Sequence, residues 1–417
     1  MRYGLIGEKL GHSFSKEIHA MFADYSYELK EIKRQDFDAF FKNPEFSAIN
    51  VTIPYKQDVI KYLSFIDEKA EKIGAVNTVV NKNGKLYGYN TDYYGLKALL
   101  VENRIDVKGK TVLILGTGGT SKTASCVVED LGAKEIIKVS RRKSETAVTY
   151  NEAEKEYGFA EVIINTTPVG MYPNIDNIPI DLDKFENLSG VADAIYNPLN
   201  SKLVQTAKEK WINASGGLYM LVAQAAAAVK FFIGKEISES EISAVYRKIL
   251  KSKQNLVLTG MPGCGKTTLG KRIAENLSRE FIDTDAEIVK KCGIGIPEIF
   301  EKFGEDGFRK IETEVIAEIS KLSGKVISTG GGAVLRPQNV FFLKQNGKIL
   351  LIDRHPEHIT ATDGRPLSGS IQKIKQLYKN RINIYKGTAD IIYNPVFSID
   401  ENVKAITEEF LNESISD

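Results

Sequence analysis

The chain has 417 residues, and its 56 lysines and arginines against 54 aspartates and glutamates leave a net charge of +2. This length predicts two or three domains, and the balanced charge offers no attraction for nucleic acid or an anionic membrane. The sequence does not begin with the charged residues and apolar stretch of a secretory signal. No apolar run approaches the roughly 20 residues that span a bilayer. The three cysteines are far apart in the sequence, so we expect free thiols in a cytoplasmic protein.

Short β-rich runs alternate with helical patterns in the N-terminal part of the chain. Strands are expected at 3–6 and 48–53, and helices at 16–25 and 92–102. This alternation predicts an α/β sheet. A long, alanine-rich apolar helix is predicted much later, at 217–233.

A new βαβ unit begins in the middle of the chain. Its strands are expected at 111–115, 135–139, 161–164 and 190–193. A helix at 238–250 with apolar residues at helical spacing then closes the first half of the protein. The connection at 251–253 is too short for a flexible tether, and another α/β unit starts with a strand at 255–258.

A glycine-rich turn joins the first strand of the middle unit to a helix. It reads Gly116-Thr-Gly-Gly-Thr-Ser-Lys-Thr-Ala124, in which Gly116 permits the tight turn. Gly118 and Gly119 let the backbone approach a pyrophosphate, which would sit on the amides at the helix start. A plain strand-to-helix turn is the structural alternative.

The residues after the second strand of this unit discriminate between two dinucleotides. An NAD site places an acidic residue there to hold the ribose hydroxyls. This chain has Ser140, Arg141 and Arg142 instead, and guanidinium groups suit the 2′-phosphate of NADP. NADPH is therefore the predicted cofactor, and a solvated basic turn is the alternative.

Several short stretches have a structural explanation when each is taken alone. They are Gly4-Leu-Ile-Gly7, His12-Ser-Phe-Ser15, Asn50-Val-Thr-Ile-Pro-Tyr-Lys56, Gly74-Ala-Val-Asn-Thr78, Tyr89-Asn-Thr-Asp92, Asn165-Thr-Thr-Pro-Val-Gly-Met171, Asp193-Ala-Ile-Tyr-Asn-Pro198 and Gly217-Leu-Tyr-Met-Leu-Val-Ala-Gln-Ala225. Together they resemble shikimate dehydrogenase over residues 1–250. The resemblance implies a substrate-binding part at 1–92 and about 217–250, and a Rossmann NADP-binding part at about 93–216.

The resemblance also implies a reaction, the NADPH-dependent reduction of 3-dehydroshikimate to shikimate. Lys56 and Asp92 are the implied catalytic pair, since an ammonium can stabilise and protonate the oxygen charge that a ketone gains on reduction. The implied substrate contacts are Ser13, Ser15, Thr52, Asn77, Tyr196 and Gln224. The implied cofactor contacts are Glu68, Gly116, Gly118, Gly119, Ser140, Arg141, Arg142, Ala194 and Gly217.

A second nucleotide motif follows at residues 260–268, which read Gly-Met-Pro-Gly-Cys-Gly-Lys-Thr-Thr. It fits the phosphate-cradling pattern G-x-x-x-x-G-K-[ST] and lies between an expected strand and a helix at 269–277. Contacts with ATP are expected at Gly263, Gly265, Lys266, Thr267 and Thr268. Lys266 would reach the β- and γ-phosphates, and the Thr267 hydroxyl would bind Mg²⁺. The pattern specifies a nucleoside triphosphate but no acceptor.

Further motifs indicate the acceptor. They are Phe281-Ile-Asp-Thr-Asp285, Gly304-Glu-Asp-Gly-Phe-Arg309, Ser328-Thr-Gly-Gly-Gly332, Asp363-Gly-Arg-Pro-Leu367 and Arg381. Taken alone, the two aspartates could cap a helix, and the arginines could be isolated surface residues. Together they resemble shikimate kinase over residues 254–417, a P-loop α/β domain similar to nucleoside monophosphate kinases. The resemblance implies transfer of the ATP γ-phosphate to the 3-hydroxyl of shikimate.

The resemblance to shikimate kinase assigns a role to each of these groups. Asp285 is the expected base, and Asp283 joins Thr267 near Mg²⁺. Lys266 and Arg365 stabilise the transferring phosphoryl group, with Arg365 on a lid that closes over the site. The implied substrate contacts are Arg309, Gly330, Gly331, Gly332 and Arg381. The two arginines suit the shikimate carboxylate, because a planar guanidinium binds a carboxylate through two hydrogen bonds.

The sequence therefore predicts a bifunctional α/β enzyme with NADPH, ATP and Mg²⁺ as cofactors. Its expected partners are the small molecules 3-dehydroshikimate and shikimate, with neither nucleic acid nor membrane, and no sequence feature specifies an oligomeric state. Quinate as a second dehydrogenase substrate is one alternative. A ligand-sensing regulator is another, but it predicts lost catalytic groups, whereas Lys56, Asp92, Lys266 and Asp285 are all present.

Overall fold

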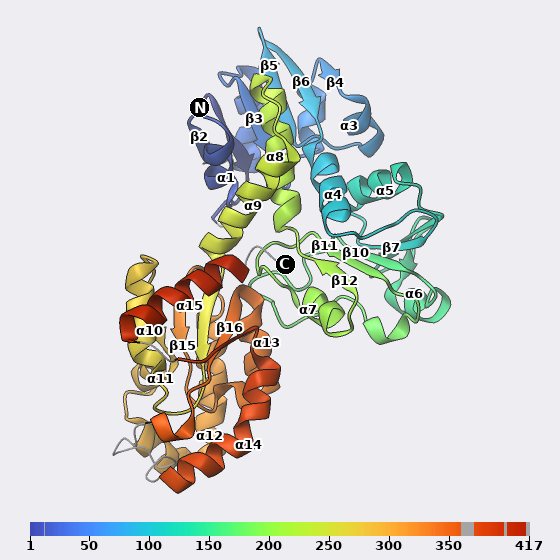
Figure 1. Ribbon diagram of the computed structural model, residues 1–417. Coiled ribbons are helices and arrows are strands. Elements are labelled where there is room, and N and C mark those ends of the chain that lie inside the picture. Colours follow the sequence, from blue (N-terminus) through green and yellow to red (C-terminus); the bar gives the residue numbers. More distant parts are fainter. Residues whose placement is uncertain (12, 360–370, 396–397, 414–417) are drawn as a thin grey trace. The chain divides into compact units, whose positions relative to one another are not determined.

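The computed structural model describes residues 1–11, 13–359, 371–395 and 398–413 (Figure 1). The chain divides into two compact units, Met1–Ile249 and Leu250–Asp417. The division lies within α9 (Glu239–Lys253), so the connector expected at 251–253 is the end of a helix. This stretch contains neither glycine nor proline, so nothing in it favours an earlier helix end.

The N-terminal part of the first unit is built on a six-stranded mixed sheet with the order β2-β1-β3-β5-β6-β4. Its strands are β1 (Tyr3–Gly7), β2 (Tyr27–Glu31), β3 (Ala48–Val51), β4 (Phe65–Ile66), β5 (Thr78–Lys82) and β6 (Lys85–Tyr89). β1 runs parallel to β2 and β3, whereas β5 runs antiparallel to β3 and β6. The β5–β6 hairpin turns at Asn83 and Gly84, both at positive φ, which an Asn-Gly pair adopts readily.

Helices cover both faces of this sheet. They are α1 (Ser15–Phe22), α2 (Phe37–Lys42), α3 (Glu68–Ile73), α4 (Thr91–Glu102) and α8 (Leu218–Ile233). α8 buries Phe232 and Ala228 on one face, in the same core as Tyr3 of β1. Phe41 of α2 and Ala70 of α3 belong to a second core on the sheet. Because α8 also packs along α4, its alanine-rich sequence is buried on most of its sides.

The middle of the first unit is a parallel sheet with the order β12-β11-β10-β7-β8-β9. Its strands are β7 (Thr111–Leu115), β8 (Glu135–Ser140), β9 (Val148–Thr149), β10 (Val162–Asn165), β11 (Gly190–Asp193) and β12 (Asn213–Ser215). α5 (Gly119–Asp130), α6 (Tyr150–Glu156) and α7 (Lys202–Glu209) connect them, and a hydrophobic core lies on each face. The strand order reverses between β7 and β10, where dinucleotides bind in such sheets. This arrangement confirms the predicted Rossmann fold.

The second unit is a five-stranded parallel sheet with the order β14-β15-β13-β16-β17. Its strands are β13 (Asn255–Thr259), β14 (Phe281–Asp283), β15 (Val326–Ser328), β16 (Gly347–Ile352) and β17 (Ile391–Tyr393). Its helices are α10 (Lys266–Asn276), α11 (Thr284–Cys292), α12 (Ile296–Ile319), α13 (Pro337–Asn346), α14 (Ile371–Thr388) and α15 (Ile399–Glu413). α12 is kinked at Gly304, which lies at φ 67° and so outside the helical region.

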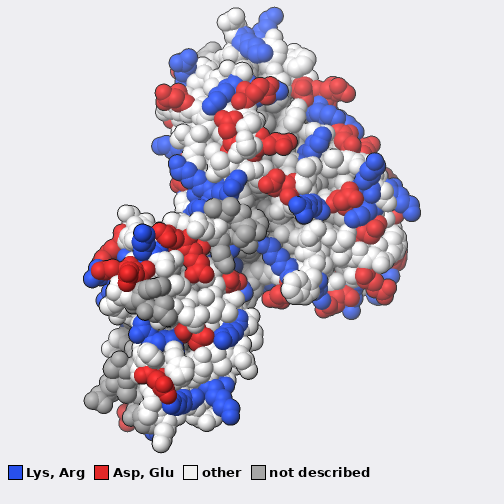
Figure 2. Space-filling model, in the orientation of Figure 1, with Lys and Arg blue, Asp and Glu red and all other residues white. Residues whose placement is uncertain are grey.

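Charged side chains of both signs are interspersed on the visible face of each unit (Figure 2), as the small net charge implies. Within the described ranges, no helix combines the length and the apolar character that crossing a bilayer requires.

Candidate active sites

Three residues predicted for the substrate pocket form one hydrogen-bonded network near the start of α4. The Lys56 ammonium donates to Oδ2 of Asp92 at 2.6 Å, and Nδ2 of Asn77 donates to Oδ1 of Asp92 at 2.9 Å. Asn77 in turn accepts from the Thr91 backbone N–H at 2.7 Å. The side chains of Lys56 and Asp92 are only 19% and 7% exposed. Such a shielded carboxylate holds the ammonium in place more firmly than a surface partner would.

The N-terminal serines lie beside a residue from the other part of the unit. The Ser13 hydroxyl donates to the Ser15 hydroxyl at 3.0 Å, where α1 begins. The ring of Phe14, between them, lies 5.4 Å from the ring of Tyr196. Tyr196 follows β11 of the Rossmann sheet. The structure thus places Phe14, the residue between the two serines, against Tyr196 from the other part of the first unit.

The remaining two substrate candidates occupy positions set by backbone packing. Thr52 follows β3, and its amide donates to the Ile6 carbonyl at 2.9 Å. Gln224 lies on α8, where a Cβ atom on Gly95 of α4 would be 3.0 Å from the Cβ of Gln224. This close approach places Gln224 against the helix whose first turn carries Asp92.

The glycine turn after β7 has the geometry that the sequence predicts. Gly116 has φ 108°, and a Cβ there would lie 2.8 Å from the Thr166 hydroxyl. A Cβ on Gly118 or Gly119 would meet only open space. α5 begins at Gly119, so the amides of its first turn lie beside that space and suit a pyrophosphate.

The other cofactor candidates divide into two groups. Gly217 lies directly on the Ala194 backbone, and any Cβ there would collide with the Ala194 carbonyl. Glu68 begins α3, and no hydrogen bond or ion pair of its side chain to the glycine turn exists within the described residues. The structure therefore brings Ala194 and Gly217 together but leaves Glu68 without such a link.

The basic turn after β8 leaves two arginines available. Ser140 and Arg142 are joined by hydrogen bonds between the Ser140 hydroxyl and the Arg142 backbone. Lys143 is occupied by an ion pair with Glu152 at 2.5 Å. Arg141 and Arg142 are exposed, and neither has an ion-pair partner in the part of the chain that the structure describes. Their charge is free to meet a phosphate.

Asp193 has no role predicted from the sequence, and the structure shows that it organises this part of the site. Its carboxylate accepts from Asn165 Nδ2 at 3.0 Å, the Ile195 N–H at 3.0 Å and the Ser201 hydroxyl at 2.5 Å. Burial raises its pKa to about 7, against the lowering effect of these hydrogen bonds. The carboxylate thereby fixes the loops after β10 and β11, and the second of these carries Tyr196.

Asp193 should make the stability of the first unit depend on pH. Its folded pKa of about 7 exceeds the ordinary value of 3.8, so the folded state binds more protons between these two values. The free energy of unfolding should therefore fall as pH rises through that window, and Asp193→Asn should flatten the fall. Urea unfolding at about pH 5 and about pH 8 measures it. Ser201→Ala, which keeps the carboxyl group, should retain the fall; an equal pH dependence in Asp193→Asn would contradict the assignment.

The phosphate-binding loop of the second unit joins β13 to α10. Gly260, Gly263 and Gly265 all have positive φ, and α10 begins at Lys266. The Lys266 ammonium is buried and donates to the carbonyls of Gly260 and Met261 at 3.0 Å each. The backbone therefore adopts a cradle whose amides gather at the start of a helix, together with Thr267 and Thr268 in its first turn.

The two metal candidates are in contact. The Thr267 hydroxyl donates to Oδ2 of Asp283 at 2.9 Å, and Oδ1 of Asp283 caps α11 by accepting from the Asp285 N–H at 3.0 Å. A hydroxyl and a carboxylate oxygen side by side suit Mg²⁺, which keeps phosphate and water among its ligands. No group of three or more acidic, histidine or cysteine side chains in the described ranges could hold a metal by itself.

The acceptor-binding candidates of the second unit converge on one glycine segment. A Cβ on Gly330 would lie 2.6 Å from Oδ1 of Asp285, and one on Gly332 would collide with the Arg309 guanidinium. Arg381 donates to the Gly331 carbonyl at 3.1 Å. These contacts bring the predicted base, both predicted carboxylate-binding arginines and the three glycines together. Arg365 lies outside the described residues.

Glu312, for which the sequence predicts no role, belongs to this cluster. Its Oε2 accepts from Arg309 at 2.8 Å, and its side chain is 1% exposed. Burial raises its pKa above the ordinary range, and Arg309 opposes that rise. Its Oε1 has no partner among the described residues. Glu312 therefore orients the Arg309 guanidinium, a role that the three-residue spacing on one helix face could have suggested.

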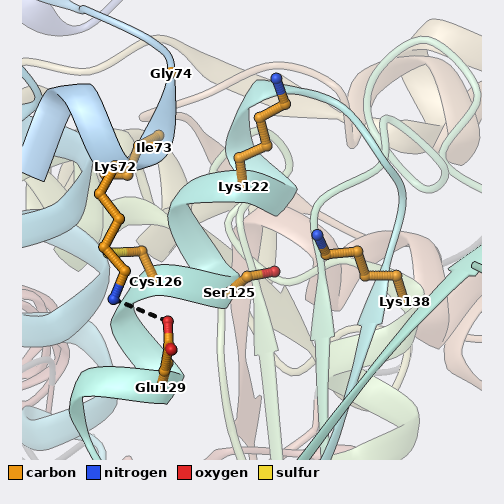
Figure 3. Close-up of a pocket in the computed structure, with 8 residues that line it drawn as sticks. All are labelled: Lys72, Ile73, Gly74, Lys122, Ser125, Cys126, Glu129 and Lys138. Carbon is orange, nitrogen blue, oxygen red and sulfur yellow. Dashed lines mark ion pairs between the residues drawn. The ribbon is translucent and has the colours of Figure 1, made fainter. Parts of the chain in front are cut away.

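A pocket of about 410 Å³ lies apart from both sets of candidates, between α3, α5 and β8 (Figure 3). It is lined by residues that include Lys72, Lys122, Lys138, Ser125, Cys126 and Glu129. Beside it, Asp130 of α5 accepts from Lys69 of α3 at 2.5 Å, a hydrogen bond that lowers the Asp130 pKa to about 2. None of the predicted site residues lines this pocket, so we assign it to the contact between the two parts of the unit.

Fold and site together define the class of each unit. The first is an oxidoreductase with a Rossmann sheet and a Lys–Asp pair, and the second is a P-loop phosphotransferase. Family models match the chain in both units: "Shikimate dehydrogenase substrate binding domain" over residues 5–79 and "Shikimate kinase" over residues 262–413.

Curated relatives and solved structures match the first unit. The NADP⁺ shikimate dehydrogenase of Clostridium beijerinckii is 41% identical over 240 residues, which are 54% of this chain and 88% of that protein. A chorismate mutase/shikimate 5-dehydrogenase fusion protein from Clostridium acetobutylicum has a TM-score of 0.56 at 36% identity, covering 59% of this chain and 96% of that one. The Thermus thermophilus shikimate 5-dehydrogenase in complex with NADP(H) and shikimate has a TM-score of 0.54 at 26% identity, covering 60% and 99%.

The chain belongs to the shikimate dehydrogenase family through its first unit, and its second unit is a shikimate kinase domain. It is a bifunctional enzyme of the shikimate pathway that uses NADP and ATP and acts on shikimate-related small molecules.

Proposed function

We propose that the enzyme works in the biosynthetic direction, reducing 3-dehydroshikimate to shikimate with NADPH and then phosphorylating shikimate at its 3-hydroxyl with Mg-ATP. Residues 1–250 would carry the first step and residues 254–417 the second. The shielded Lys56–Asp92 pair beside Asn77 is the observation that carries the proposal. A cytoplasmic location is part of it and is supported by three free cysteines.

For the first step, bound NADPH would supply the reducing equivalent, and the chain would supply charge and orientation. The Lys56 ammonium, held by Asp92, would stabilise the oxygen of the substrate carbonyl as it gains negative charge and would give it a proton. Ser13 and Ser15 offer hydroxyls to the substrate carboxylate. Thr52, Tyr196 and Gln224 would line the remainder of the pocket.

For the second step, bound Mg-ATP would supply the phosphoryl group. Asp285 would accept the proton of the attacking hydroxyl, and Arg309 and Arg381 would hold the shikimate carboxylate. Thr267 and Asp283 would hold Mg²⁺, directly or through water. Product analysis tests the two steps: the full chain with 3-dehydroshikimate and NADPH should form shikimate, and added Mg-ATP should convert it to the 3-phosphate. Product phosphorylated at another hydroxyl, or no shikimate at all, would contradict the proposal.

The preference for NADPH over NADH should depend on Arg141. Its guanidinium is exposed, has no ion-pair partner among the described residues, and lies where the 2′-phosphate of NADPH is expected, a phosphate that NADH lacks. Arg141→Ala should raise the KM for NADPH about tenfold and leave that for NADH nearly unchanged. Initial rates with each cofactor measure it. The matched control is Lys143→Ala, because Lys143 is already paired with Glu152. Equal weakening of both cofactors would refute the assignment.

A further inference from the structure

An arginine outside every predicted site lies beside the phosphate-binding loop. Arg354 follows β16, which neighbours β13 in the sheet, and β13 leads directly into that loop. The loop abuts the end of β16, since a Cβ on Gly260 would lie 2.7 Å from the Ile352 carbonyl oxygen. At the other end of the loop, a Cβ on Gly265 would lie 4.0 Å from Nη2 of Arg354. The guanidinium therefore lies at the edge of the cradle where α10 begins.

The bonding of Arg354 leaves its charge available. Within the described ranges, its Nε is buried without a hydrogen-bond partner, and no carboxylate forms an ion pair with its guanidinium. The adjacent Asp353 is instead engaged by Tyr378 at 2.8 Å and Lys386 at 3.4 Å. A buried donor without an acceptor costs free energy. The guanidinium nitrogen that approaches the loop is Nη2, and an anion in the cradle would lie next to it. Lys266 differs in this respect, because two loop carbonyls accept from its ammonium.

We propose that Arg354 is a nucleotide-binding residue that contacts the α- and β-phosphates. The amides at the start of a P-loop helix cradle these two phosphates, and Gly265 immediately precedes α10. A planar guanidinium beside them can donate two hydrogen bonds to phosphate oxygens. This role differs from that expected of Arg365, which acts on the transferring γ-phosphoryl group. Because the α- and β-phosphates remain in ADP, Arg354 should contribute equally to the binding of ATP and ADP.

Calorimetric titration of the full chain with ADP and Mg²⁺, and with ATP and Mg²⁺ in the absence of shikimate, tests the proposal. In Arg354→Ala, the Kd for both nucleotides should rise about tenfold, because one charge-assisted contact is lost. Arg354→Lys should recover only part of the affinity, since an ammonium cannot form the two parallel hydrogen bonds that a planar guanidinium donates. Arg272→Ala is the matched control: Arg272 lies on α10 but is exposed and pairs with Asp400, so the affinities should not change.

An unchanged ADP affinity in folded Arg354→Ala would overturn the proposal, even if kcat fell, because the arginine would then act on the γ-phosphoryl group alone. If the alanine variant does not fold, Arg354→Gln decides by the same criterion, since it keeps most of the side-chain volume. A wild-type chain that binds no ADP would contradict the kinase assignment instead.

Discussion

Replacing Lys56 with alanine should lower kcat/KM for NADPH-dependent reduction of 3-dehydroshikimate by about 10²–10⁴-fold, the range typical of a lost acid or base. The ammonium is the cation that Asp92 holds, at 2.6 Å, beside Asn77. Its loss removes both the charge that stabilises the reduced oxygen and the proton that neutralises it. Initial rates of NADPH oxidation measure the effect.

The same variant should phosphorylate shikimate at nearly the wild-type rate, because Lys56 belongs to the first of two compact units. Lys61→Ala is the matched control. Lys61 also forms an ion pair, with Asp38 at 3.1 Å, but its side chain is 59% exposed, so both activities should be unchanged. Loss of both activities in Lys56→Ala would show that the two units depend on each other. Full dehydrogenase activity would remove Lys56 from the mechanism.

Replacing Asp285 with asparagine should have the converse effect and lower the kinase kcat by about 10²–10⁴-fold. Oδ1 of Asp285 closely approaches the backbone of Gly330, in the cluster that also contains Arg309 and Arg381. An amide of the same shape cannot accept the proton of the attacking hydroxyl. ADP release at saturating shikimate and Mg-ATP measures the loss, and NADPH oxidation by the first unit should be unaffected.

Glu287→Gln controls for the loss of a negative charge on α11. Glu287 lies half-buried on the same helix, and its neighbour is Lys290, at 3.3 Å. Its replacement should leave kcat unchanged. An Asp285→Asn enzyme with a normal kcat and only a raised KM for shikimate would show that Asp285 binds the acceptor without acting as the base.

Local patterns predicted the parts of the sites that adjoin strands and helix starts. The loop from Gly260 to Thr267 follows from strand, glycine turn and helix in sequence, and the structure has it. The resemblance to shikimate kinase implied that Asp283 lies near Thr267, and the two side chains are in contact. Asp92, at the start of α4, was identified through the resemblance to shikimate dehydrogenase, because its local pattern alone predicts only a helix start. Parallel sheets place the ends of their strands along one edge, so residues just after strands meet there.

Contacts between segments far apart in the chain could not be predicted in this way. The role of Asp193 depends on donors from two other segments, Asn165 and Ser201, whose packing no single motif specifies. Arg354 lies beside the phosphate-binding loop only because β16 is next to β13 in the sheet, and sequence alone does not determine that strand order. The end of α9 was placed too early for a different reason: no residue between 251 and 253 distinguishes a connector from a helix.

The most direct test follows NADPH consumption and ADP release together, in full-length protein supplied with 3-dehydroshikimate, NADPH and Mg-ATP. We predict that both occur and that ADP release stops when NADPH is omitted, because shikimate must be formed before it can be phosphorylated. Consumption of NADPH without any ADP release, even after shikimate is added, would contradict the assignment of two consecutive activities to this chain.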